Sequence, residues 1–306
     1  MDLGQRATAR CIACQGTAVE IGEVPYSYHF LQYRFAAPLD SGNLYECPIC
    51  GLWFKYPYLS EDQVAKFYRD APESLSWEGG EGRLDFASTL SAISHAFPQG
   101  GSVLDFGCYT GGFLRLLPDQ YRRNGIEPSA TAGEVAAAYR IEIVGRDISA
   151  LGDRQFDCIT LFDVFEHLTE PLRTVDTLFA HVRPGGLLCI GTGFADSPAF
   201  HLSGPKYNYV CMPEHSCFLT RRFLMFLSDR LKAEYEFSKI RKVRSSLQWI
   251  VRAAAINSLN SPMLLLKSKK AIFRWYPSHR LRVLTSRGML PLFDLGDHAV
   301  VVFKKS

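Results

Sequence analysis

The stretch Val103-Leu104-Asp105-Phe106-Gly107-Cys108-Tyr109-Thr110-Gly111-Gly112 decides the fold of this chain. Its apolar start predicts a buried strand, and its glycines predict a tight turn that leads into a helix over about 112–117. Glycine lets the backbone approach a bound small molecule, and the first N–H groups of such a helix are expected to face it. Glu127 lies 22 positions after Asp105, at the end of a second predicted strand over 122–126. A nucleotide-binding βαβ unit places its ribose-binding carboxylate at this distance.

Short apolar strands and helices alternate beyond this turn. The expected strands lie near 102–106, 122–126, 141–144, 156–162 and 187–192, and the expected helices near 112–117, 130–138 and 171–181. This alternation predicts an α/β fold with a Rossmann-like, doubly wound, mostly parallel sheet and helices on both faces. A further helix over 220–230 and strands over 233–240 and 298–303 follow. Ligands of such sheets bind at the carboxyl ends of the strands.

Three motifs together carry a family resemblance. The turn reads Asp105-x-Gly107-x-Tyr109-x-Gly111, and Phe156-Asp157-Cys158-Ile159 and Arg183-Pro184-Gly185-Gly186 follow it. With them, the region from about 98 to 231 and the last strand resemble the class I S-adenosylmethionine (SAM)-dependent methyltransferases. The usual family turn has a glycine where this chain has Tyr109. A glycine turn in an α/β protein with a different ligand is the alternative.

The resemblance implies a last strand that lies antiparallel beside the sixth, and a SAM site at matching positions. The expected cofactor-binding residues are Asp105, Gly107, Tyr109, Gly111, Glu127, Asp147, Ile148 and Asp163. The turn residues match positions that hold the methionine part of SAM, and Glu127 matches the carboxylate that accepts both ribose hydroxyls. Asp147 and Ile148 match the adenine contacts, and Asp163 lies beside the methyl donor. Solvated loop acids are the alternative for Glu127 and Asp147.

A Glu-His pair, Glu214-His215, follows the fifth strand, where this fold builds its acceptor site. Its Tyr-rich surroundings resemble those in bacterial sugar methyltransferases with an N-terminal zinc module, where the His is the general base. Histidine suits this role because its pKa lies near neutrality, and Glu214 would orient it or hold a substrate hydroxyl. A His that only holds the loop is the alternative. A second pair, Glu166-His167, either lines the site or caps the next helix.

Two cysteine pairs with identical spacing occur near the N-terminus. They are Cys11-Ile12-Ala13-Cys14 and Cys47-Pro48-Ile49-Cys50. Two such knuckles supply four thiolates for tetrahedral Zn²⁺, which predicts a structural zinc ribbon at Cys11, Cys14, Cys47 and Cys50. Unrelated surface thiols are the alternative.

Composition and charge narrow the class of protein. The chain has 306 residues, 47% of them hydrophobic, and shows neither a signal peptide nor a long uninterrupted apolar run, so we expect a cytoplasmic protein. Twelve basic and no acidic residues lie between 237 and 292, which leaves 22 basic against 31 acidic residues elsewhere. Such a block favours an anionic partner, including peripheral contact with an anionic membrane through 237–292. A solvated basic face is the alternative.

These observations divide the chain into four parts. Residues 1–58 form the zinc-ribbon module, 59–97 a helical connector, 98–240 with 293–306 the SAM-binding domain, and 241–292 a basic amphipathic insertion.

The expected function is SAM-dependent methyl transfer, as O- or C-methylation, to a small-molecule or glycan-type acceptor, anionic in character, for example a nucleotide-sugar or polysaccharide precursor. An RNA methyltransferase is an alternative, although the chain lacks an Asn-Pro-Pro-Tyr-like or catalytic-Cys signature and nucleic acid is therefore not the expected partner. A non-catalytic binding protein that keeps the fold is another.

Overall fold

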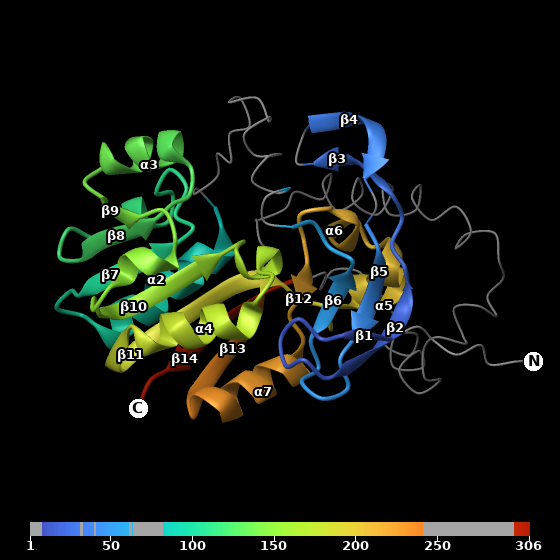
Figure 1. Ribbon diagram of the computed structural model, residues 1–306. Helices are drawn as coiled ribbons and strands as arrows, with labels where there is room; N and C mark the ends of the chain where they lie inside the picture. The colour runs from blue at the N-terminus through green and yellow to red at the C-terminus, as the bar shows by residue number, and fades with distance from the viewer. Residues whose placement is uncertain (1–7, 31–32, 40, 61–62, 64–81, 241–296) are drawn as a thin grey trace, which may run out of the picture.

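The computed structural model describes residues 8–30, 33–39, 41–60, 63, 82–240 and 297–306 (Figure 1). Its larger sheet has seven strands in the order β13-β14-β11-β10-β7-β8-β9. They are β7 (Ser102–Phe106), β8 (Arg122–Ile126), β9 (Glu142–Gly145), β10 (Phe156–Phe162), β11 (Val182–Gly193), β13 (Glu234–Ile240) and β14 (His298–Lys304). Strands β7 to β11 pair in parallel, and β14 lies antiparallel between β11 and β13. The predicted Rossmann-like sheet with an antiparallel last strand is confirmed.

Helices cover both faces of this sheet because its strand residues alternate between two apolar cores. Leu104, Ile159 and Leu188 belong to the core beneath α4 (Pro171–Ala180) and α7 (Arg221–Leu231). Their neighbours Val103, Cys158 and Leu187 belong to the other core, beneath α2 (Leu84–Ala96) and α3 (Ala130–Ala137). This period-two alternation is what a sheet buried on both faces requires.

The helix expected over 112–117 is not an α-helix. Only a three-residue 3₁₀ helix, η1 (Leu114–Leu116), forms there. Leu117 is already extended, with ψ 136°, because a residue before proline avoids the α region and Pro118 follows. The turn therefore presents no helix N-terminus to a ligand, and its backbone and neighbouring side chains have to make the site.

The N-terminal part of the chain forms a second, antiparallel sheet. Its strands are β1 (Thr8–Arg10), β2 (Thr17–Glu23), β5 (Asn43–Glu46), β6 (Trp53–Tyr56) and β12 (Cys217–Phe218), in that order. A separate ribbon pairs β3 (Ser27–Phe30) with β4 (Tyr33–Leu39). The last strand of the sheet, β12, comes from far along the chain, after the short helices α5 (Pro198–Ser203) and α6 (Asn208–Cys211).

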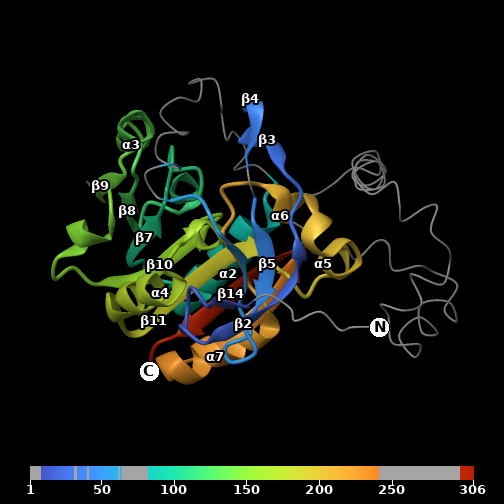
Figure 2. The same ribbon diagram turned by 45° about the vertical axis from the view of Figure 1, so that its right-hand side comes forward.

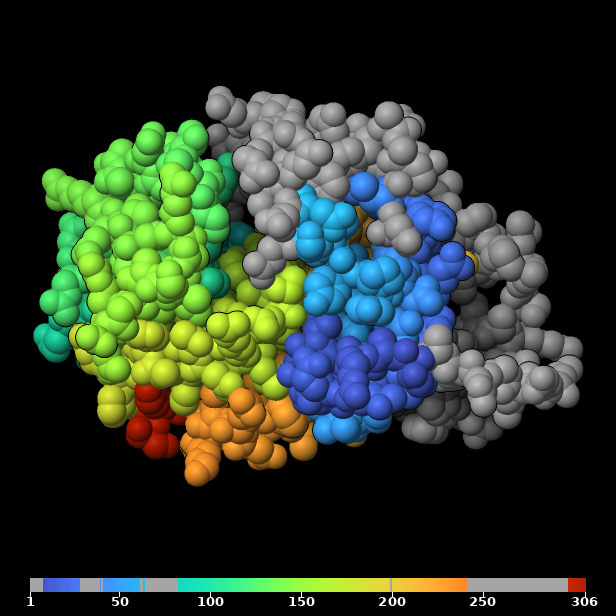
Figure 3. All heavy atoms as spheres, in the orientation of Figure 1, coloured from blue at the N-terminus to red at the C-terminus, as the bar shows by residue number. Residues whose placement is uncertain are grey.

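The N-terminal sheet and the larger sheet are joined side by side, as two views of the ribbon show (Figures 1 and 2). Cys217 pairs with Phe54 and Phe218 with Trp53 across β12 and β6. The Thr220 hydroxyl, which caps α7, also donates to the Gly51 carbonyl at 2.7 Å. In the space-filling view the N-terminal module touches the larger sheet's helices along this junction (Figure 3).

Several predicted features lie outside the residues that the structure describes. They are the basic insertion over 241–292, with its proposed membrane contact, and most of the first half of the connector, 61–62 and 64–81. Among the described helices, none combines the length and apolar character that a bilayer crossing needs.

Candidate functional site

The turn after β7 takes the conformation that its glycines allow. Gly107, Tyr109 and Gly111 have positive φ values of 80°, 49° and 78°. A Cβ at Gly107 would lie 2.5 Å from the Val164 side chain, and one at Gly111 would lie 2.2 Å from Ile141. A left-handed non-glycine residue costs about 1–2 kcal/mol. Tyr109 adopts this left-handed conformation, and its N–H donates to Glu127 Oε2 at 2.7 Å. The turn therefore forms although a tyrosine replaces the usual glycine.

Glu127 lies directly after β8 and connects three backbone segments. Its carboxylate accepts the N–H groups of Tyr109 and Ser129, at 2.7 and 2.8 Å, and its own N–H donates to Gly145 at the end of β9. Only 7% of the residue is exposed, and this burial raises the pKa of the carboxyl against the effect of the two backbone hydrogen bonds. A carboxylate is therefore held at the turn, facing the start of α3.

Asp105 is a buried carboxyl group near the end of β7. Its Oδ1 accepts the Thr160 hydroxyl at 2.7 Å, and burial raises its pKa to about 7. The charges of Glu127 and Asp163 act in the same direction, and the nearby guanidinium of Arg83 opposes them. The fold thus gathers three of the predicted acids, Asp105, Glu127 and Asp163, at the carboxyl ends of neighbouring strands.

Arg83 is a site residue that the sequence did not reveal. Its guanidinium pairs with Asp163 at 3.0 Å and with Asp85, and it lies over the ring of Phe86 at 4.0 Å. It precedes α2 and has no motif of its own, so only the folded position of α2 over the sheet brings it to these acids. A cation and several carboxylates therefore share this edge of the sheet.

Asp147 and Ile148 lie at the next strand end, as expected. Asp147 is exposed, and hydrogen bonds from the Ser149 hydroxyl and the Ser149 N–H lower the pKa of its carboxyl. The bond from the Ser149 N–H, at 2.8 Å, also caps the short 3₁₀ helix Ile148–Leu151. Ile148 is partly buried against the core. The pair sits beyond β9, the strand that neighbours Glu127.

The two Glu-His pairs, far apart in sequence, meet in the fold. His215 Nδ1 lies 2.8 Å from the Tyr209 carbonyl, and His167 Nδ1 lies 3.1 Å from the Glu214 carbonyl. The two rings cross edge to face with centroids 4.9 Å apart. A carbonyl only accepts, so Nδ1 of each ring carries a proton, and in the neutral ring Nε2 holds the lone pair. Glu214 and His215 are both buried.

Glu166 fastens this loop to the sheet. It is 1% exposed and accepts hydroxyl hydrogen bonds from Tyr209 and, at 2.7 Å, from Thr192 of β11. Its backbone carbonyl accepts the Ser216 N–H at 2.7 Å. The sequence pointed to the pair Glu166-His167, and Glu166 accepts several of the hydrogen bonds that tie the loop to the sheet. The Gly193 N–H of β11 adds another by donating to the Tyr209 hydroxyl at 3.1 Å. Asp163 and Glu166 flank one short segment after β10, so the carboxylate site and the Glu-His loop adjoin.

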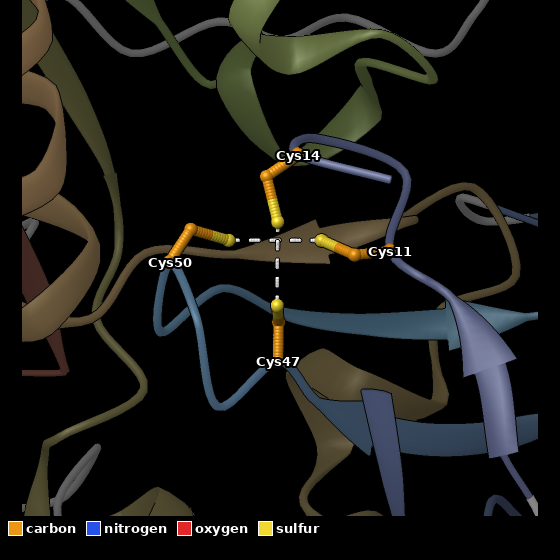
Figure 4. A group of neighbouring side chains, drawn as sticks. All are labelled: Cys11, Cys14, Cys47 and Cys50. Atoms are coloured by element: carbon orange, nitrogen blue, oxygen red, sulfur yellow. Dashed lines mark hydrogen bonds between the residues drawn. The ribbon is translucent and has the colours of Figure 1, made fainter. Parts of the chain in front are cut away.

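The four predicted zinc ligands converge (Figure 4). Cys11 and Cys14 lie in the turn between β1 and β2, and Cys47 and Cys50 in the turn between β5 and β6. The sulfur atoms of Cys11 and Cys50 are 3.6 Å apart, and those of Cys14 and Cys47 are 3.4 Å apart. Tetrahedral Zn²⁺ with bonds of about 2.3 Å separates its sulfur ligands by about 3.8 Å. The donor set and its spacing fit a zinc ion with little adjustment.

Residues 80–228 match the protein family described as "Methyltransferase domain". This part of the chain is a class I SAM-dependent methyltransferase domain. The match covers the glycine turn, the gathered acids and the Glu-His loop, so these features belong to the methyltransferase domain, whereas the four cysteines lie outside it.

Curated relatives match the same region. A ubiquinone biosynthesis O-methyltransferase of Xanthomonas campestris pv. campestris is 27% identical over 143 residues, which are 42% of this chain and 56% of the relative. A tRNA U34 carboxymethyltransferase of Campylobacter curvus is 23% identical over 181 residues, 52% of this chain and 60% of the relative. The chain thus spans little more than half the length of these relatives. Among solved structures, a SAM-dependent methyltransferase of Thermotoga maritima aligns with a TM-score of 0.44 at 16% identity, over 72% of this chain and 89% of that one.

Proposed function

We propose that this protein transfers the methyl group of SAM to a hydroxyl oxygen of a small-molecule or glycan-type acceptor. The observation that carries the proposal is the pair of buried carboxyl groups, Asp105 and Glu127, around a positive-φ turn beside a loop with an oriented imidazole. SAM supplies an activated methyl group on a cationic sulfur. Burial raises the pKa of both carboxyl groups because it destabilises their charged forms. A bound cation stabilises those charged forms.

In this proposal each strand end contacts one part of the cofactor. Glu127 accepts the ribose hydroxyls, and Asp147 with Ile148 receives the adenine. Asp105 and the turn residues hold the methionine part, with Asp163 beside them. Arg83, now paired with Asp163, adds a guanidinium suited to the methionine carboxylate.

On the acceptor side, His215 is the proposed general base. Its Nδ1–H is engaged by the Tyr209 carbonyl, which orients Nε2 as the proton acceptor of the neutral ring. Glu214 holds the hydroxyl or the imidazole. Alignment of the oxygen with the methyl group contributes about 7–11 kcal/mol in favourable cases. The relatives named O-methyltransferases support oxygen as the acceptor atom, whereas a carbon acceptor would first have to lose a proton to become a nucleophile.

The first prediction tests the cofactor. Wild-type protein should bind S-adenosylhomocysteine, the demethylated cofactor, in calorimetric titration. Glu127→Ala should bind it roughly 10- to 100-fold more weakly, because a hydrogen bond to a charged group contributes about 1.5–3 kcal/mol.

The matched control is Glu134→Ala, at an exposed position of the neighbouring helix α3, which should bind like wild type. Glu127→Gln, which keeps one acceptor oxygen for Tyr109 or Ser129, separates cofactor contact from support of the turn. A folded wild-type protein that binds neither SAM nor its product would reject the proposal and favour a different ligand.

A second prediction concerns pH. Asp105, with a pKa of about 7, is largely protonated below that pH, and a bound cation favours its ionised form. SAM should therefore bind more tightly at pH 8 than at pH 6 and release a proton near neutrality. In the free protein, the raised pKa of Asp105 makes the folded state more stable at low pH. Its contribution to the free energy of unfolding is fully present below about pH 4 and is lost as the pH rises through about 7.

Titrations in buffers of different ionisation heat measure this proton. Asp105→Asn should abolish most of the release, and Asp119→Asn, on an exposed loop, should leave it unchanged. Equal proton release in wild type and Asp105→Asn would show that another group titrates, with Glu127 the next candidate.

A further inference from the structure

Lys55 is a lysine without access to water. It lies on β6 of the N-terminal module and is 1% exposed. Its ammonium donates to the Met212 carbonyl at 2.6 Å and reaches the Pro213 carbonyl at 3.5 Å. These two carbonyls directly precede Glu214 and His215 in the methyltransferase domain.

The backbone of the same residue holds the other end of the loop. The Lys55 N–H donates to the Ser216 carbonyl at 2.8 Å, and β6 continues into its pairing with β12. Side chain and backbone of Lys55 thus contact residues on both sides of Glu214-His215. A loop bound at both ends by one residue of a neighbouring sheet has few ways to rearrange.

The charge of Lys55 also faces the loop. Burial lowers the pKa of the ammonium to about 8, and the carboxylate of Glu214 acts in the opposite direction. A buried ammonium is costly, and an apolar side chain of similar length would avoid that cost. Loop carbonyls and the charge of Glu214 compensate the ammonium, and Cys211, just before the loop, acts in the same direction as Glu214. The charge of Lys55 therefore acts on this loop.

We propose that Lys55 is a positioning residue that holds the Glu214-His215 loop in place, which makes the N-terminal module a working part of the acceptor site. The chemical consequence rests on the proposed role of His215, but the positioning itself does not. The contact also connects the cysteine cluster to the loop, because Cys50 lies five residues before Lys55 in the β5–β6 hairpin.

The test compares two variants. Lys55→Met keeps the length of the side chain but loses its charge and its hydrogen-bond donors, whereas Lys55→Arg keeps the charge and the donors. The control is Lys304→Met, at an exposed position of β14. Hydrogen exchange of peptides covering 207–217 is measured together with affinity for S-adenosylhomocysteine, zinc content and the rate at which diethyl pyrocarbonate modifies His215.

Lys55→Met should keep its zinc and its affinity for S-adenosylhomocysteine, while exchange in 212–217 and modification of His215 speed up by about tenfold or more. Lys55→Arg should restore much of the protection, which a loss of packing alone would not explain. Should Lys55→Met fail to fold, Lys55→Gln, with an amide donor on a shorter side chain, is judged by the same criteria.

Unchanged exchange and modification in Lys55→Met would overturn the proposal. Failure of wild type to bind S-adenosylhomocysteine would reject the proposed function instead, and the exchange data would still decide the role of Lys55.

Discussion

Replacing His215 by alanine should reduce methyl transfer by about 10²- to 10⁴-fold, the usual contribution of a general base. The affinity for S-adenosylhomocysteine should stay close to that of wild type, because the carboxylates that we assign to the cofactor lie at other strand ends. The rate is measured as S-adenosylhomocysteine formed with an acceptor from a screen of nucleotide-sugars and hydroxylated aromatic compounds. A drop in kcat without a change in cofactor affinity assigns His215 to the chemical step.

A matched variant distinguishes a base from a loop support. His215→Asn places an amide N–H where Nδ1–H stands, so it can keep the hydrogen bond to the Tyr209 carbonyl while lacking a basic nitrogen. It should be as inactive as the alanine variant. If His215→Asn retains wild-type turnover, the imidazole supports the loop and another group takes the proton.

Replacing Cys47 by serine should abolish zinc binding and disorganise the N-terminal sheet. Metal analysis of wild type should give one zinc per chain and of the variant almost none. The loss should be large, since structural zinc sites contribute about 10–16 kcal/mol of apparent binding free energy in small zinc domains. Because Cys47 and Cys50 shape the β5–β6 turn, exchange protection should fall in β5, β6 and β12 together, and the methyltransferase sheet should keep its own protection.

The control for this experiment is Cys211→Ser. Cys211 is a free, half-buried thiol outside the four-cysteine cluster, with its sulfur 3.6 Å from the Pro205 carbonyl. This variant should retain full zinc and full protection of β6. A wild-type protein that is natively folded and free of metal would contradict the zinc assignment altogether.

Much of the fold was readable from local sequence because its signals are short-range. The apolar run before Asp105, the glycines at 107 and 111 and the alternation of strands and helices each depend on neighbouring residues, and the seven-stranded sheet followed as expected. The convergence of the cysteine pairs could also be predicted, because two Cys-x-x-Cys turns of equal spacing commonly combine into one tetrahedral four-cysteine metal site. The prediction of a helix over 112–117 was wrong because Pro118 keeps Leu117 in an extended conformation.

Only part of the candidate site could be predicted from the sequence. Glu127 and the two Glu-His pairs stand at recognisable spacings, and the turn around Tyr109 could be located although its φ could not. Arg83 had no signal of its own, because its role arises from Asp163, which is distant in sequence. Glu166 was recognisable only as part of the second Glu-His pair, and its hydrogen bonds with Thr192 and Tyr209 depend on the folded chain.

Local sequence thus determined that this chain builds a Rossmann-like methyltransferase sheet with a glycine turn, acids at its strand ends and a four-cysteine cluster. The joining of the two sheets through β12, and the burial of Lys55 against the Glu214-His215 loop, were decided by packing between residues more than 150 positions apart. Such contacts depend on which surfaces meet once each sheet has formed, and neither periodicity nor spacing within one segment records them.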